Sequence, residues 1–186
     1  MKRRNFIQKY IDSFSCGKCG NTYCCTKTNA TQKRVQSKAS RTRYKDKIVY
    51  GNIPVDFKLL NYGDTEGRLS IFISTNNQKG FGPPLHIHYT FDEFFCVLKE
   101  VLFQLGDEII PLDKGDTIFI PRNVKHSFSY DGETSGTLLV GITPAKGMEK
   151  YFADMGKLLT GGIPDMVAMQ QLYKSNNSEI LGPPMK

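Results

Sequence analysis

From Ile48 onward, short runs of alternating apolar and polar residues are separated by turn-forming segments rich in Gly, Asn and Asp. Alternation with a period of two is typical of half-buried β-strands. The pattern predicts strands at Val55–Leu60, Arg68–Ser74, Leu85–Tyr89, Glu93–Lys99, Val101–Leu105, Glu108–Leu112, Thr117–Pro121, His126–Tyr130 and Thr137–Thr143. Many short strands without intervening helices indicate an all-β antiparallel sandwich or barrel.

The pattern changes after Pro144 to apolar residues at helical spacing, which predicts a helix over Gly147–Leu159. A second helix is predicted from Pro164, since proline suits the first helical turn, to about Tyr173. We expect both helices to pack on the outside or the mouth of the barrel. The methionines on their apolar face are expected to serve packing, and they are Met155, Met166 and Met169.

The composition supports one hydrophobic core, since the chain has 186 residues, 39% of them hydrophobic and 12 of them Phe. The net charge of +7 is uneven, because residues 1–47 carry +11 and residues 48–186 carry −4. We therefore divide the chain into a basic, Cys-containing N-terminal arm (1–47), a β-barrel (48–146) and a C-terminal helical extension (147–186). No apolar run reaches the roughly 18–20 residues of a membrane span.

The basic arm has two interpretations. Its charge would suit nucleic acid or anionic lipid, but a solvated or targeting segment is preferred, so no nucleic-acid partner is predicted. The start Lys2–Lys9 (KRRNFIQK) resembles a bacterial twin-arginine export signal, which implies an exported or periplasmic protein if it functions and a cytoplasmic one otherwise. The polar stretch that follows lacks the apolar segment of a signal, and a local reading-frame change over residues 10–35 would explain it.

Four of the five cysteines lie in the same arm, namely Cys16, Cys19, Cys24 and Cys25. Cys-x-x-Cys is half of a zinc-binding pattern, and a structural zinc site usually takes a second well-spaced pair. The arm is therefore either a thiol-bearing tail or, less favoured, a zinc-binding one. The fifth cysteine, Cys96, falls in a predicted strand and is expected to be a small buried core residue.

All three histidines of the chain fall where a single metal site would need them. His86 and His88 lie two residues apart in a predicted strand, so their side chains share a face. Glu93 begins the next strand, and His126 follows a strand that ends in a proline turn. Three neutral imidazoles and one carboxylate suit a divalent Fe, Mn, Ni, Cu or Zn ion, and the residues do not choose among these metals.

Two segments match paired motifs at specific spacings. The first has Gly, five residues, His-x-His and a Glu, and the second has Gly, five residues, Pro and a His; the matching residues are Gly80, His86, His88, Glu93, Gly115, Pro121 and His126. These motifs resemble those of the cupin superfamily, and the ending Ser178–Pro184 is similar to the tail of quercetinase-like single-domain cupins. The resemblance implies a small jelly-roll barrel that binds one metal ion through His86, His88, Glu93 and His126.

Three positions depart from the motifs. Asn123 replaces a glycine, and asparagine can still adopt the left-handed conformation. Tyr130 replaces a final Asn that is not a ligand position. Glu100 replaces the closing glycine of the first motif, where the sequence suggests a hairpin turn that has lost a residue. Because the ligands of the first motif, His86, His88 and Glu93, precede Glu100, we expect the metal site to form at some cost in stability.

The first functional hypothesis is a metal-dependent dioxygenase resembling quercetinases, with an aromatic or enolisable small molecule as substrate. Glu93 would be both a ligand and a catalytic proton acceptor. Expected pocket walls are Phe81, Phe95, Phe103, Phe128 and Tyr130.

The alternative is a non-catalytic cupin that binds a small ligand or metal as a sensor or carrier; a metal-dependent isomerase or decarboxylase is less favoured. The latter would need a second carboxylate or a Lys near the metal, and Asp92 should face the opposite way on its strand. A homodimer is the expected oligomer.

Overall fold

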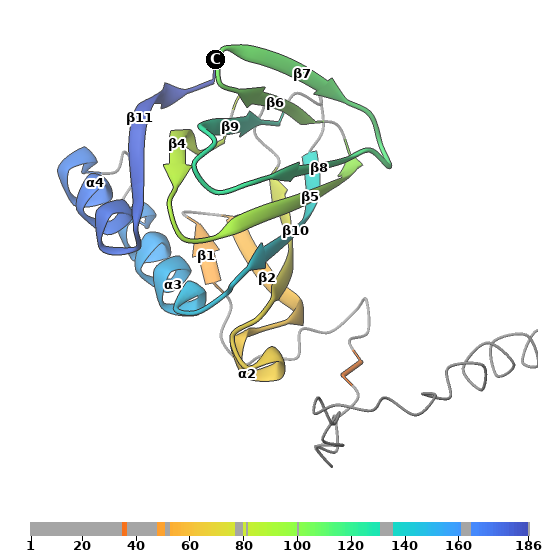
Figure 1. Cartoon of the computed structure of the whole chain (residues 1–186), viewed down its shortest axis with the longest axis vertical. Helices are drawn as coiled ribbons and strands as arrows, with labels where there is room; N and C mark the ends of the chain where they lie inside the picture. The colour runs from red at the N-terminus through yellow and green to blue at the C-terminus, as the bar shows by residue number, and fades with distance from the viewer. Residues whose placement is uncertain are drawn as a thin grey trace, which may run out of the picture. The chain divides into compact units, whose positions relative to one another are not determined.

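The computed structural model describes residues 35–36, 48–50, 53–76, 80, 82–99, 101–130, 136–160 and 165–185. Within them, a six-stranded sheet has the order β1-β2-β3-β10-β5-β8 and a five-stranded sheet has the order β11-β4-β9-β6-β7 (Figure 1). The strands are β1 Ile48–Tyr50, β2 Ile53–Leu60, β3 Ser70–Asn76, β4 Pro84–His88, β5 Asp92–Lys99, β6 Val101–Leu105, β7 Glu108–Leu112, β8 Thr117–Ile120, β9 His126–Ser129, β10 Gly136–Thr143 and β11 Ser178–Pro184. The antiparallel all-β jelly-roll prediction is confirmed.

The two sheets face each other across an aromatic core. Along β5, Phe95 and Val97 are buried while Phe94 and Leu98 are exposed, which is the period of two that the sequence shows. The Phe95 ring contacts Phe103 of the opposite sheet, with ring centroids 5.0 Å apart and an interplanar angle of 62°. Burial of these inward-facing side chains supplies the main driving force that holds the sheets together.

Two helices follow β10, namely α3 at Met148–Leu159 and α4 at Met166–Ser175. The helix α4 lies beside β11, and α3 contacts α4 and β1 (Figure 1). The helix α4 begins two residues later than predicted, because the Asp165 carboxylate caps it by accepting from the N–H groups of Val167 and Ala168. Met155 and Met169 are buried as expected, but Met166 is 52% exposed, so its packing role was wrongly predicted.

Three short elements were missed, namely β1, β11 and the helix α2 at Tyr62–Thr65. The strand β11 lies within the predicted helical extension, yet it pairs with β4, with Ser178 opposite His88 and Ile180 opposite His86. The C-terminal segment therefore contributes to the sheet that carries all three site histidines, which lie on β4 and β9. The domain boundaries themselves stay a prediction.

The hairpin interpretation at Glu100 was wrong. Glu100 itself lies outside the described residues, but β5 before it and β6 after it belong to different sheets, so the chain crosses between sheets here. The pairing of β5 with β10 shifts register close by, since Thr137 is opposite Lys99 and Leu138 is opposite Val97. Cys96 is only half-buried, because the inward positions of β5 belong to its neighbours Phe95 and Val97.

The predictions about the N-terminal arm, including the export signal, the four cysteines and the reading-frame change, lie outside the described residues apart from Val35 and Gln36. Among the helices that the structure describes, none has the length and apolar character needed to cross a bilayer.

Candidate metal centre

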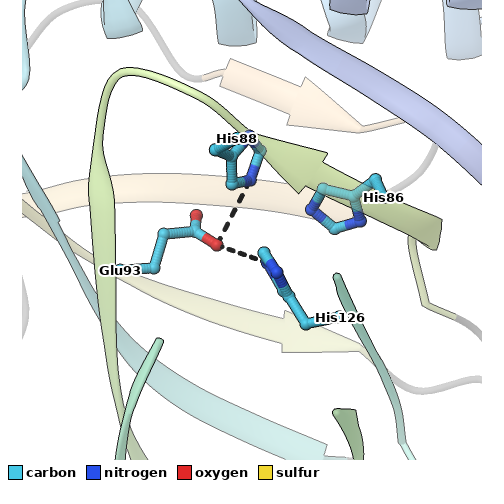
Figure 2. Close-up of side chains that lie close together, drawn as sticks. All are labelled: His86, His88, Glu93 and His126. Atoms are coloured by element: carbon cyan, nitrogen blue, oxygen red, sulfur yellow. Dashed lines mark hydrogen bonds and ion pairs between the residues drawn. The ribbon is translucent and has the colours of Figure 1, made fainter. Parts of the chain in front are cut away.

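The four predicted ligands come from three strands and meet inside the barrel (Figure 2). His86 and His88 lie on the same face of β4, and His86 is paired across the sheet with His126 of β9. Glu93 reaches the cluster from β5 of the opposite sheet. One ligand atom from each residue lies within 4.8 Å of all the others, so the geometry can hold a metal ion.

All four side chains are buried. The His86 and His126 rings have centroids 4.3 Å apart, and those of His86 and His88 are 4.6 Å apart. Glu93 Oε2 lies 2.8 Å from His126 Nε2 and 3.3 Å from His88 Nε2 (Figure 2). The Nε2 atoms, rather than the Nδ1 atoms, therefore face the carboxylate.

The second nitrogen of each histidine has a protein partner, which the sequence did not reveal. His86 Nδ1 donates to the Pro84 carbonyl at 2.7 Å, and His126 Nδ1 donates to the Val124 carbonyl at 3.0 Å. Both carbonyls belong to the residue two positions earlier in the chain. A carbonyl only accepts, so these bonds place the proton on Nδ1 and leave Nε2 with a lone pair.

A hydrogen bond to a serine places the proton of His88 on Nδ1 as well. Its Nδ1 lies 2.8 Å from Ser178 Oγ, and Ser178 Oγ donates to the Asn176 carbonyl at 3.2 Å. Because the serine hydrogen is used for Asn176, the oxygen accepts from His88 Nδ1–H. All three imidazoles thus have their Nδ1 engaged, which leaves Nε2 available to a metal ion.

This arrangement needs a positive charge among the four side chains. His126 Nε2 and Glu93 Oε2 both present lone pairs at 2.8 Å, and His88 Nε2 is buried without a hydrogen bond. Two acceptor atoms that face each other repel unless a proton or a cation lies between them. A buried nitrogen without a hydrogen bond, such as His88 Nε2, also destabilises the folded protein. The residues present therefore fit a divalent ion bound by three imidazoles and one carboxylate.

The electrostatics favour the ligand-competent forms. Burial, followed by the proximity of His126 and His88, holds the pKa of His86 well below its usual value. Burial would raise the pKa of Glu93, but His88 and His126 together lower that pKa well below the ordinary range. A neutral imidazole and an ionised carboxylate are the states that bind metal.

The turn before β9 shapes the site. Asn123 has φ 67°, which confirms the left-handed conformation expected where the motif has glycine. Its N–H donates to the His88 carbonyl at 2.7 Å and so links the turn to β4. Asp92 faces away from the cluster, as predicted, and binds Arg122 with both carboxylate oxygens.

A cavity of about 120 Å³ opens beside the cluster, and His86, His88 and Glu93 form part of its wall. Three of the predicted wall residues line it, namely Phe95, Phe128 and Tyr130. Phe103 does not; it is fully buried in the core, opposite Phe128 in the β6–β9 pair. Phe81 lies outside the described residues.

The sequence reasoning missed wall residues from other parts of the chain. Phe72 comes from β3 and Phe91 from the β4–β5 turn, while the C-terminal helices supply Tyr151, Phe152, Met155 and Tyr173. Tyr173 also contacts the His86 ring, with centroids 5.5 Å apart. The helical periodicity of 148–159 was the available signal, since it identified an apolar face without showing what that face covers.

Comparisons with known proteins agree with the fold. Residues 75–142 match the Cupin_2 family model, described as "Cupin domain", and this match together with the jelly roll shows that the chain carries a domain of the cupin superfamily. No curated protein matches the sequence significantly.

Several solved structures resemble this chain at low sequence identity. KdgF from Halomonas sp. is 15% identical, with 61% of this chain and 96% of that chain covered and a TM-score of 0.51. An RmlC-like cupin from Shewanella frigidimarina is 22% identical, with 61% and 93% covered and a TM-score of 0.49. A predicted oxalate decarboxylase from Thermotoga maritima is 20% identical, with 60% and 98% covered and a TM-score of 0.49. At such identities the KdgF match supports the fold alone.

Proposed function

We propose that the cluster of His86, His88, Glu93 and His126 binds one divalent transition-metal ion, and that the protein is a metal-dependent dioxygenase acting on an aromatic or enolisable small molecule. The observation that carries the metal proposal is the pair of lone-pair atoms, His126 Nε2 and Glu93 Oε2, held 2.8 Å apart while His126 Nδ1 donates elsewhere. A cation among the ligands removes this conflict and also engages the orphaned His88 Nε2.

The proposed oxidative chemistry rests on coordination number. Four protein ligands leave one or two positions on a five- or six-coordinate ion. A bound divalent transition ion would supply a Lewis acid and an open position for dioxygen or a substrate oxygen. The adjoining cavity has mainly aromatic and aliphatic walls, which would hold an aromatic substrate and keep water away.

The protein's own groups have separate roles in this proposal. The histidines hold the ion through Nε2, and their Nδ1 bonds keep the rings oriented. Glu93 offers a second carboxylate oxygen besides Oε2, and this oxygen would accept the proton that an enol or phenol loses on binding. Phe91 stacks on the His88 ring with centroids 4.1 Å apart and limits its movement.

The second candidate is a non-catalytic cupin that binds a small ligand. It is favoured by one observation: among the described residues that line the cavity, Glu93 is the sole carboxylate and there is no Lys or Arg. The same observation disfavours an isomerase or decarboxylase that needs an additional acid or base near the metal.

Metal analysis of protein purified without added metal or a histidine tag tests the proposal. We expect near one equivalent of metal in the wild type, loss of it in His86→Ala and Glu93→Ala, and no loss in Glu108→Ala, which removes an exposed glutamate. Oxygen consumption with phenols and enolisable ketones then tests the dioxygenase. Absence of metal after reconstitution would overturn the metal centre, while tight ligand binding without oxygen uptake would support the non-catalytic alternative.

We also propose a homodimer. The outer face of the six-stranded sheet exposes Phe94, Leu98 and Phe119, and Phe94 pairs directly with Phe119, so an apolar patch is available. Light scattering after size-exclusion chromatography would decide between dimer and monomer. Export through the twin-arginine-like start is likewise a proposal, which fractionation of a tagged full-length chain would test.

A further inference from the structure

The cavity beside the metal cluster is small, and its wall carries little charge. Its volume is about 120 Å³, and its described lining residues are aromatic, aliphatic or hydroxyl-bearing apart from the three cluster residues His86, His88 and Glu93. For scale, an engineered apolar cavity of about 150 Å³ binds benzene. A cavity of this volume therefore holds about one ring.

The charges of the site limit the substrate further. Three neutral imidazoles, one carboxylate and a divalent ion sum to one positive charge, which matches a single enolate or phenolate oxygen. A second anionic group would lie against Phe72, Phe95 or Phe152 with no Lys or Arg among the described lining residues to compensate it. Burying an unpaired charge among apolar side chains is strongly unfavourable, so dianions and phosphates are excluded.

A hydroxyl pair offers a second, neutral recognition point. Tyr130 Oη and Ser74 Oγ lie 2.8 Å apart, and both residues line the cavity. The bond between them uses one of their two O–H hydrogens, so the other can be donated to a substrate oxygen. Burial raises the pKa of Tyr130 to about 12, which keeps this phenol protonated at neutral pH.

The C-terminal helices set the size of the cavity. Tyr151, Phe152 and Met155 on α3 and Tyr173 on α4 all line it, and all lie beyond residues 75–142, where the cupin match ends. These side chains are buried, and Phe152 packs edge-on against Phe72 with centroids 5.1 Å apart. A larger molecule must displace this wall.

We propose that the substrate or ligand is an uncharged, single-ring phenol or a compact enol of similar size, which on binding passes one proton through Glu93 to solvent, and that α3 excludes larger molecules. The proposal rests on the metal centre proposed above. It differs from a flavonol-type substrate, since a flavonol has three rings and a cavity of this volume accommodates about one.

Calorimetric titration of zinc-loaded protein tests the proposal, because zinc is redox-inactive and binding is measured without turnover. The probes are catechol (one ring), oxalate (compact but doubly charged) and 2,3-dihydroxynaphthalene (the same chelating group on two rings). We expect catechol to bind at one equivalent, and each of the other two to bind about tenfold more weakly or worse.

A matched pair of variants tests the size limit. Met155→Ala shortens a buried methionine that lines the cavity, whereas Met169→Ala shortens a buried methionine on α4 that does not. We expect Met155→Ala to gain about tenfold in affinity for the two-ring probe, and Met169→Ala to bind it as the wild type does. Circular dichroism checks that both variants fold.

The outcomes separate the two proposals. Failure of the wild type to retain zinc would overturn the metal centre itself. Retained zinc with oxalate bound more tightly than catechol would overturn the substrate class while leaving the metal centre intact. Equal affinity of the wild type for the one-ring and two-ring probes would overturn the size limit set by α3.

Discussion

Ser178→Ala tests whether the last strand orients a metal ligand. Ser178 is 2% exposed, and its Oγ accepts from His88 Nδ1 at 2.8 Å while donating to the Asn176 carbonyl at 3.2 Å. Removing the hydroxyl leaves the buried Nδ1–H without its acceptor and releases the constraint on the ring. Loss of such an outer partner typically weakens metal binding by about 10- to 100-fold, or roughly 1.4 to 2.7 kcal/mol.

Competition of the protein with a chromophoric chelator for Zn²⁺ or Co²⁺ measures this loss. The matched control is Ser175→Ala, which removes an exposed hydroxyl that donates to the Leu172 carbonyl at 2.8 Å. We expect the control to bind metal as the wild type does. Ser178→Cys should give an intermediate affinity, because a thiol sulfur is a weaker acceptor than a hydroxyl oxygen.

The reasoning would be refuted by a folded Ser178→Ala variant that binds metal as tightly as Ser175→Ala. That result would mean that the packing of the His88 ring, rather than its hydrogen bond, sets its orientation. Equal losses of metal affinity in Ser178→Ala and Ser175→Ala would also contradict the proposed role of the Ser178 hydroxyl. The loss would then be a general effect of altering the C-terminal segment. Far-UV circular dichroism and thermal unfolding of the metal-free proteins separate misfolding from loss of the ligand's partner.

At free metal concentrations near 100 times Kd, binding to the native state alone adds roughly 2.7 kcal/mol to the free energy of unfolding. Removing the metal with a chelator should therefore lower the melting temperature by about 5–10 °C, as measured by differential scanning calorimetry. Tyr130 has its pKa raised by burial from 10.0 to about 12, so the wild type should lose roughly 2–3 kcal/mol of stability as pH rises from 10 to 12. Over that pH range Tyr130 loses its proton in the unfolded chain before it does so in the folded protein. Urea unfolding of Tyr130→Phe should therefore show a smaller loss of stability with pH than the wild type. An equal dependence of stability on pH in the two proteins would contradict the role given to Tyr130. Gly82→Ala places a Cβ 1.8 Å from the Phe128 carbonyl oxygen and should cost roughly 2–3 kcal/mol in urea unfolding, whereas Gly63→Ala meets its nearest atom at 3.4 Å and should cost less.

Local sequence patterns were enough to predict the barrel and the clustering of His86, His88, Glu93 and His126. The period of two placed His86 and His88 on one face of β4, because strand side chains alternate regardless of what surrounds them. The same rule put Glu93 inside and Asp92 outside, as observed. Asn123 in the left-handed conformation also followed from a residue type and its position in a turn.

Other expectations failed where the outcome depended on which strands become neighbours. The residues around Glu100 suggested a hairpin, but β5 and β6 lie in different sheets, and a sequence pattern does not specify sheet membership. Phe103 and Phe128 looked equivalent as pocket walls, yet only Phe128 reaches the cavity. Phe128 lies on β9, which adjoins the histidine-bearing strand β4, whereas Phe103 lies on β6, one strand further away.

The sequence by itself determined the strands β2 to β10, their inward faces and the identity of the four clustered side chains, because these depend on backbone periodicity and residue type. Only the tertiary structure decided how that cluster is completed. Ser178 orients His88 from 90 residues away, and the walls from α3 and α4 close the cavity. Such long-range contacts are selected by the packing of the whole core, so no local pattern in the chain encodes them.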